Sequence, residues 1–184
     1  EQGLRQLQLK HVPTPTELTA ALMEIQQELR LPRLPGRMEC YDISNIQGKM
    51  AVGSMVVFEQ GRPKPAHYRR FRIKTVAGAD DYAMLTEVLT RRFKRSHQDD
   101  NPTATWAIMP DLVLIDGGKG HLNAALSAMA AAGAGAIQVA GLAKENEELF
   151  IPGQSAPIAL PETSPARHML QRLRDEAHRF AISY

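Results

Sequence analysis

The apolar residues of the 184-residue chain change along its length between a period of two, typical of strands, and a period near 3.6, typical of helices. The run at 112–115 is apolar throughout, which indicates a strand buried on both faces. In all, the pattern predicts five strands, at residues 38–44, 50–59, 67–74, 112–115 and 136–143. It also predicts four helices, at about 16–29, 81–95, 122–132 and 165–181, the second capped by Asp80 or Asp81 and the last by Ser164.

The order of these elements favours one α/β domain at 37–184, preceded by a helical extension at 1–36 that packs on it. From residue 37 onward the order is three strands, helix, strand, helix, strand, helix. An antiparallel meander of three strands, extended by two parallel strands and covered by helices on both faces, resembles the ribonuclease H-like arrangement. In that arrangement the first and fourth strands are neighbours in a five-stranded mixed sheet.

Two acidic residues stand on those neighbouring strands. Asp42 shares a strand face with the apolar Met38 and Cys40, and Asp116 ends the apolar run before a glycine-rich turn. Two carboxylates brought together in a partly buried place cannot both ionise cheaply unless a cation or a proton lies between them. Metal binding is the simplest explanation. A strand-end carboxylate satisfied by backbone donors and a turn cap are the alternatives.

One histidine has a setting that fits the same chemistry. On the last predicted helix, His178 lies about 140° from Leu173, the centre of the apolar stripe, and so borders the core. A neutral imidazole there could ligate a metal ion or relay a proton, although a merely hydrogen-bonded histidine fits equally well. The other histidines lack a comparable setting: His11, His67, His97, His121 and His168.

The formal net charge of +2 is unevenly distributed. Residues 61–95 hold ten basic and three acidic residues, net +7, whereas the remainder holds 12 basic and 17 acidic residues, net −5. Clustered basic residues are typical of a surface that faces a polyanion, and a solvated basic face is the alternative. The candidate contacts to a DNA backbone are Arg70, Arg72, Arg91 and Arg92, with Lys119 in the glycine-rich turn and Lys144 after the last strand.

Composition excludes several classes of protein. The single cysteine, Cys40, excludes an internal disulfide and a cysteine-rich zinc site, and it fits a reducing cytoplasm. No apolar run approaches the length of a membrane span or of a secretory signal. Because Glu1 is not a natural start, we expect a piece of a longer protein.

Five sequence blocks carry a family resemblance. They are Arg37-Met-Glu-Cys-Tyr-Asp-Ile-Ser-Asn-Ile-Gln-Gly48, Tyr68-Arg-Arg-Phe71, Asp80-Asp-Tyr82, Leu114-Ile-Asp-Gly-Gly-Lys-Gly120 and Arg174-Asp-Glu-Ala-His-Arg-Phe180. In this order they resemble the carboxy-terminal nuclease region of UvrC, the incising subunit of the bacterial UvrABC excinuclease. The resemblance implies a cytoplasmic ribonuclease H-like endonuclease that makes the 5′ incision beside a lesion in damaged double-stranded DNA. The implied partners are UvrB and the damage complex loaded by UvrA, met mostly through regions outside this chain.

The resemblance also implies the site residues. The family's catalytic and metal-binding triad falls on Asp42, Asp116 and His178, with Mg²⁺ or Mn²⁺ as the cofactor, and Asp81 matches a further acidic position linked to activity. Two rival functions stay open. One is a ribonuclease H that cleaves RNA in a hybrid, with Glu87 as an extra carboxylate. The other is a catalytically silent nucleic-acid-binding or docking module whose acidic pair is structural.

Overall fold

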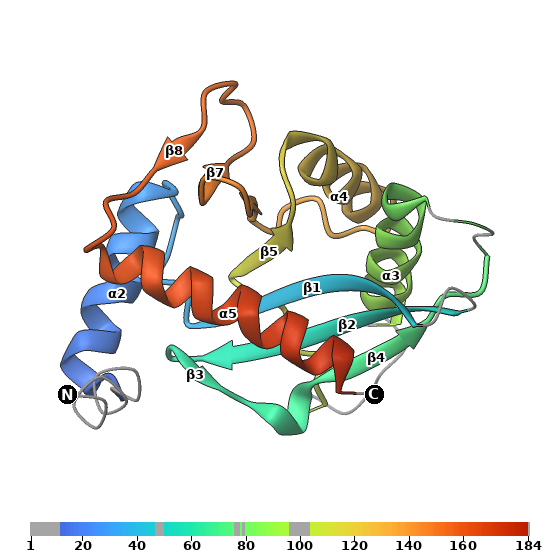
Figure 1. The fold of residues 1–184 in the computed structure, drawn as a ribbon, viewed down its shortest axis with the longest axis horizontal. Coiled ribbons are helices and arrows are strands. Elements are labelled where there is room, and N and C mark those ends of the chain that lie inside the picture. The colour runs from blue at the N-terminus through green and yellow to red at the C-terminus, as the bar shows by residue number, and fades with distance from the viewer. Residues whose placement is uncertain (1–11, 47–49, 76–77, 79, 96–103, 184) are drawn as a thin grey trace.

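Residues 12–46, 50–75, 78, 80–95 and 104–183 of the computed structural model are described here. They form a mixed α/β fold in which helices lie on both sides of one sheet (Figure 1). The helices are α2 (Pro15–Glu28), α3 (Asp81–Arg95), α4 (Lys119–Ala131) and α5 (Pro165–Ile182), with a short 3-10 helix, η1 (Pro65–His67). The strands are β1 (Arg37–Ile46), β2 (Met50–Glu59), β3 (Arg62–Pro63), β4 (Arg69–Arg72), β5 (Leu112–Asp116), β6 (Val139–Ala143), β7 (Glu148–Phe150) and β8 (Ile158–Ala159).

The sheet has the strand order β3-β2-β1-β5-β6-β7-β8, and β4 also pairs with β2. Strands β1, β5 and β6 are parallel to one another, and the other pairings are antiparallel. The five predicted strands and the adjacency of the first and fourth are therefore confirmed. The described residues add three short strands, β3, β7 and β8, at the two ends of the sheet.

The helices begin at side chains that satisfy the free backbone N–H groups of a first turn. Thr14 forms a reciprocal capping box with Glu17 at the start of α2. For α3, it is Asp80 rather than Asp81 that accepts from a backbone N–H, that of Ala83, at 3.1 Å. Ser164 caps α5, and Glu24 of α2 accepts from the Ser164 hydroxyl and from the backbone N–H of Ala166, each at 2.8 Å. The amino end of α5 is thus fixed to α2.

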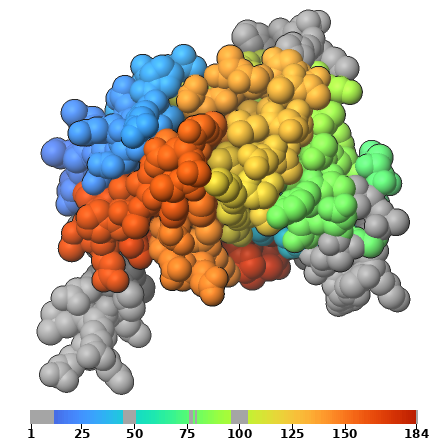
Figure 2. Space-filling view, turned by 90° about the horizontal axis from the view of Figure 1, so that it is seen from above, coloured from blue at the N-terminus to red at the C-terminus, as the bar shows by residue number. Residues whose placement is uncertain are grey.

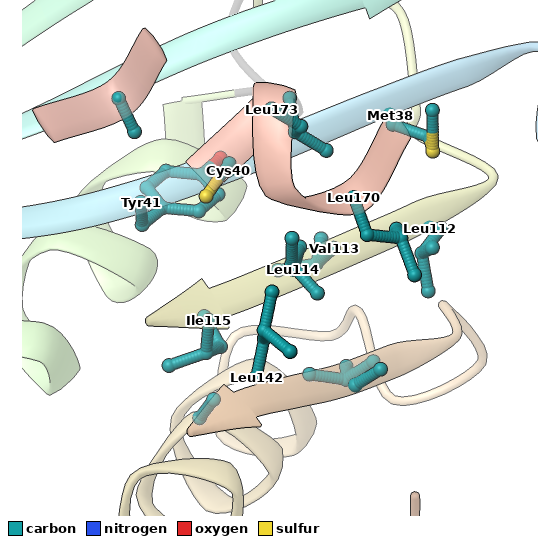
Figure 3. Close-up of a cluster of buried hydrophobic side chains, with 14 of the residues drawn as sticks. Met38, Cys40, Tyr41, Leu112, Val113, Leu114, Ile115, Leu142, Leu170 and Leu173 are labelled. Carbon is teal, nitrogen blue, oxygen red and sulfur yellow. The ribbon is translucent and has the colours of Figure 1, made fainter. Parts of the chain in front are cut away.

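Apolar packing joins α5 to one face of the sheet (Figure 3). Leu170 and Leu173 of α5 lie over the β1 and β5 side chains on that face, which include Cys40 and Leu114. The apolar positions of α2 predicted from helical spacing, Leu18, Leu22, Ile25 and Leu29, are all buried in the same core. Helices α3 and α4 lie side by side in both views of the molecule (Figure 2). No helix within the described ranges combines the length and the hydropathy needed to span a bilayer.

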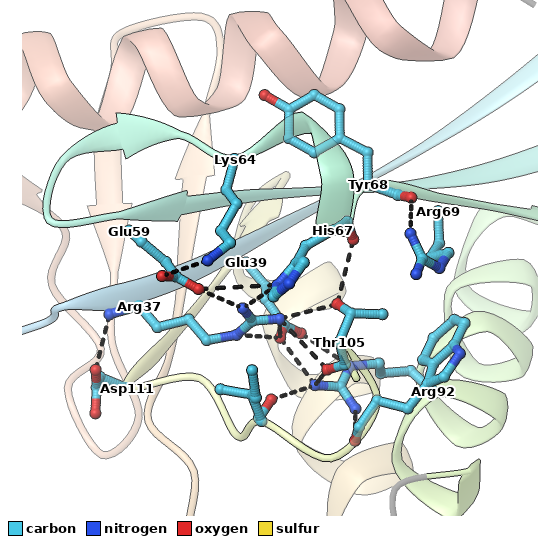
Figure 4. A network of polar contacts seen from close by, with 12 residues as sticks. Arg37, Glu39, Glu59, Lys64, His67, Tyr68, Arg69, Arg92, Thr105 and Asp111 are labelled. Carbon is cyan, nitrogen blue, oxygen red and sulfur yellow. Dashed lines mark hydrogen bonds and ion pairs between the residues drawn. The ribbon is translucent and has the colours of Figure 1, made fainter. Parts of the chain in front are cut away.

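A buried ionic network lies on the face of β1 turned toward α3 (Figure 4). Glu39 and Arg92 have no exposed surface, and they form two hydrogen bonds of 3.1 and 2.9 Å. Arg37 and the Tyr41 hydroxyl also donate to Glu39. Arg92 further donates to the backbone oxygens of Trp106 and Ile108, so it holds the segment before β5 against the sheet. The prediction that Arg92 contacts DNA is therefore wrong, because its guanidinium neutralises a carboxylate inside the protein.

We expect Arg92→Met to lower the free energy of unfolding by about 3–5 kcal/mol, because it leaves the buried Glu39 charge without its main partner. Lys94→Met, an exposed change on the same helix, is the matched control and should shift stability by about 0.5 kcal/mol or less. Urea unfolding followed by circular dichroism measures both. Similar midpoints for the two variants would show that the network does not hold the fold together.

Candidate active site

The parallel pairing of β1 with β5 brings two carboxylates to one edge of the sheet. Tyr41 is the register partner of Ile115, and each strand continues by one residue to an acid, Asp42 or Asp116. Open α/β sheets bind ligands at this kind of edge, beyond the carboxyl ends of parallel strands. The backbone leaves the edge at Gly117, whose φ of +152° is a conformation that favours glycine.

A cavity of about 240 Å³ lies at this edge. It is lined by residues of the two strands and of the first turns of α3 and α4: Tyr41, Asp42, Ile43, Asp81, Leu85, Ile115, Asp116 and His121. Three of the sequence-predicted acidic residues, Asp42, Asp81 and Asp116, are therefore brought together at one small cavity.

Asp42 is a buried carboxylate without a full set of partners. Its residue is only 8% exposed, and its Oδ2 has no hydrogen-bond partner among the described residues. Burial raises the pKa of Asp42, and the charge of Asp116 raises it further, whereas His178 opposes both effects. A metal cation at this position would relieve the repulsion between the two carboxylates and give the Asp42 Oδ2 a partner.

His178 approaches Asp42 from the α5 side. Its Nδ1 lies 3.6 Å from Asp42 Oδ2, slightly beyond a hydrogen bond, and its side chain is 54% exposed. The helical wheel predicted this histidine at the border of the core, and in the structure it is an exposed residue that lies beside the buried Asp42. Of the predicted triad, Asp42 and Asp116 line one cavity, and His178 lies near Asp42 but is not among the residues that line the cavity.

The donor set suits a hard divalent cation. Carboxylate oxygens are the preferred protein ligands of Mg²⁺ and Mn²⁺, and the unpartnered Asp42 Oδ2 is one such oxygen. In the described part of the chain, no group of three or more His, Cys, Asp or Glu side chains is gathered closely enough to hold a metal ion. Asp42, Asp116 and His178 nevertheless carry donor atoms of the kind that such an ion takes, carboxylate oxygens and an imidazole nitrogen.

His121 is the cavity residue that the sequence reasoning missed. Its ring packs directly on Gly117, where an added Cβ would lie 2.4 Å from the imidazole Cγ, and it meets Tyr82 edge to face with ring centroids 4.7 Å apart. Gly120 makes the corresponding room for Tyr82, whose hydroxyl would be 2.2 Å from an added Cβ. Close packing against His121 and Tyr82 thus explains why the turn has glycine at positions 117 and 120. The available signal was the position of His121 in the first turn of the helix that follows Asp116.

The candidate DNA contacts differ in their surroundings. Arg72 and Lys144 are exposed, and Lys119 is exposed beside a separate cavity of about 300 Å³ that includes Ile151. Arg91 donates to the backbone oxygen of Arg72 and to Glu87, at 2.7 and 3.1 Å. The Arg70 guanidinium contacts the end of α5.

A larger cavity, about 510 Å³, lies at the opposite end of β1 and is not a better candidate. Its cationic side chains are already occupied: Arg37 pairs with Glu39 and Glu59, and Lys64 pairs with Glu59. Charges that neutralise one another within the protein leave little to attract a ligand. The acidic edge of β1 and β5 differs, because no Lys or Arg among the described residues forms an ion pair with Asp42 or Asp116, and His178 lies 3.6 Å from Asp42.

The profile of the UvrC RNAse H endonuclease domain matches residues 26–182. UvrABC system protein C of Dehalococcoides mccartyi is 54% identical over 181 residues, which is 98% of this chain and 30% of the relative. The same protein of Moorella thermoacetica is 58% identical over 165 residues, 90% of this chain and 26% of the relative. The chain thus spans less than a third of the length of these relatives.

Among solved structures, endonuclease V of Ciona intestinalis in complex with a DNA containing inosine is similar over 91% of this chain and 96% of that chain. It has a TM-score of 0.49 and 12% sequence identity. The family match covers most of the chain, and the relatives share about half of its residues over nearly its whole length. The family match and the two relatives therefore lead to one conclusion: the chain belongs to the family of UvrC RNAse H endonuclease domains.

Proposed function

We propose that the chain is a metal-dependent DNA endonuclease domain that makes the 5′ incision beside a lesion in bacterial nucleotide excision repair. The observation that carries the proposal is the pairing of the buried Asp42 with the half-buried Asp116 at the edge of the sheet, where Asp42 Oδ2 has no hydrogen-bond partner among the described residues. A carboxylate kept only for structure would have its oxygens bonded to donors. The family membership and the names of the relatives support the repair reaction and damaged duplex DNA as its substrate.

Asp42 and Asp116 would hold Mg²⁺ or Mn²⁺, and His178 would complete the shell or move a proton at its Nδ1, the ring nitrogen nearest Asp42. When bound, the ion supplies polarisation of the scissile phosphate and activation of a water for in-line attack. Asp81, which lines the same cavity from the first turn of α3, would orient that water through its carboxylate. The exposed Arg72, Lys119 and Lys144 would contact the DNA backbone.

Glu87, the extra carboxylate that the rival ribonuclease H function requires, is used elsewhere in the fold. Glu87 accepts hydrogen bonds from the backbone N–H groups of Lys74 and Thr75, each at 2.8 Å, and pairs with Arg91 at 3.1 Å. It does not line the cavity of Asp42 and Asp116. Glu87 therefore stabilises the segment after β4, and the site favours the repair reaction.

The partners belong to the proposal as well. UvrB and the damage complex loaded by UvrA would deliver the DNA, largely through parts of the relatives that this chain does not include. The compartment would be the bacterial cytoplasm, where the substrate DNA lies and where the buried Cys40 thiol stays reduced.

The decisive test is incision by the full-length protein assembled with UvrB on a damaged duplex in Mn²⁺ or Mg²⁺. We expect Asp42→Asn and Asp116→Asn each to lower the 5′ incision rate by at least about 100-fold, because each removes a charged ligand of the ion. Asp175→Asn, an exposed aspartate on α5, is the control and should incise normally. Undiminished incision by both site variants would support the docking module. Preferential cleavage of an RNA–DNA hybrid would support ribonuclease H.

A second prediction concerns stability without metal. The folded protein raises the pKa of Asp42, so ionising this carboxyl costs stability, and the full cost is present once the pH exceeds the raised pKa. At pH 8 in EDTA, Asp42→Asn should therefore stabilise the chain by about 1 kcal/mol, because the amide carries no charge to be buried or repelled by Asp116. The gain should vanish below pH 3.8, the ordinary pKa of the group, where wild-type Asp42 is protonated too. Thermal unfolding across this pH range measures the gain, and a destabilised variant at pH 8 would contradict it.

A further inference from the structure

The end of α5 that carries His178 rests on a row of three residues across the sheet. Asp42 of β1 is the register partner of Ser54 of β2, and Ser54 is the partner of Arg70 of β4. Directly opposed residues of paired strands share one face, so this row lies on the face that α5 covers. Figure 1 shows α5 crossing β1 and β2, with its carboxyl end toward β4. Asp42 and Arg70 therefore flank the last turns of α5 from opposite ends of the row.

Arg70 contacts the last turn of α5 in three ways. Its Nη2 donates to the backbone oxygen of Phe180 at 3.1 Å and to the Ser183 hydroxyl at 2.9 Å. Its Cζ also lies 3.9 Å from the centroid of the Phe180 ring. A cation at the carboxyl end of a helix satisfies free carbonyl groups and complements the helix dipole. These contacts fix the backbone two residues after His178.

Tyr68 holds the same helix two residues before His178. Its hydroxyl donates to Glu176 at 2.7 Å, and its ring meets Phe180 edge to face with centroids 5.1 Å apart. Burial and the Glu176 carboxylate raise the pKa of Tyr68, so the phenol remains a donor throughout the physiological range. Together, Tyr68 and Arg70 contact residues on both sides of His178 along the helix.

We infer that Tyr68 and Arg70 are positioning residues that hold the last turns of α5, and hence the His178 imidazole, against Asp42. The importance of this positioning for catalysis rests on the proposed function, whereas the effect of Tyr68 and Arg70 on the position of His178 does not. The distance between His178 and Asp42 is already slightly beyond a hydrogen bond, so a small shift of α5 would separate them. Arg70 therefore has a role apart from any contact with DNA phosphate.

The test compares Arg70→Met and Tyr68→Phe with Arg72→Met, which removes an exposed charge on the same strand face. In the metal-free chain, the ring signals of His178 in NMR spectra, assigned with His178→Ala, report its surroundings. We expect Arg70→Met and Tyr68→Phe to move these signals toward those of a solvated histidine and to speed amide exchange of residues 178–182 at least tenfold. Arg72→Met should change neither. Wild-type-like spectra and exchange in both Arg70→Met and Tyr68→Phe would overturn the inference.

With Mn²⁺ added, electron spin-echo spectroscopy detects a nitrogen nucleus coupled to the ion. We expect a coupling in the wild type that His178→Ala abolishes, that Arg70→Met and Tyr68→Phe at least halve, and that Arg72→Met preserves. A wild type without this coupling would remove His178 from the proposed metal shell, and the metal-free spectra would still decide the positioning role. In the full-length protein, Arg70→Met should lower kcat for incision beyond any change in DNA affinity that it shares with Arg72→Met. If Arg70→Met and Arg72→Met lost DNA affinity equally and kcat did not change, Arg70 would be a contact to DNA phosphate and not a positioning residue.

Discussion

The parallel pairing of β1 with β5 is the constraint on which the candidate site depends. Its register places the last residues of two apolar strands side by side, and in both strands the next residue is an aspartate. A slip of one residue would turn every side chain to the other face of the sheet and would take Glu39 out of its buried ionic network, so packing and charge together favour this register. The energy of the core therefore enforces the proximity of two like charges that would separate if they were free to do so.

The two faces of β1 each carry a buried acidic residue, but the two residues differ in how completely their oxygens are paired. On the α3 face, Glu39 is surrounded by donors from Arg37, Tyr41 and Arg92, so its charge is matched within the protein. On the α5 face, Asp42 keeps a free oxygen and faces a second carboxylate. Buried polar groups whose hydrogen bonds are all satisfied make a fold rigid, whereas a buried polar group that lacks a partner favours binding of a ligand that supplies one. The first acid belongs to the scaffold, and the second has the properties of a site.

Much of the fold could be predicted from the sequence, because periodicity reports directly which faces are buried. The five main strands, the four helices and the adjacency that joins Asp42 to Asp116 followed from it. The burial of Arg92 could not be predicted, since a charge run looks the same whether a guanidinium faces solvent or an acid on a strand 53 positions earlier. The place of His121 in the cavity was also missed, because it depends on the room left by Gly117 rather than on any period in the sequence.

The attachment of α5 at both of its ends has a mechanical consequence. Glu24 of α2 holds the amino end, and Arg70 of β4 holds the carboxyl end. An α-helix of 18 residues is a stiff rod about 27 Å long. A displacement of α2 along the axis of α5 would thus be transmitted through α5 and change the distance between the His178 imidazole and Asp42. The position of α2 is in this way linked to the geometry of the candidate site.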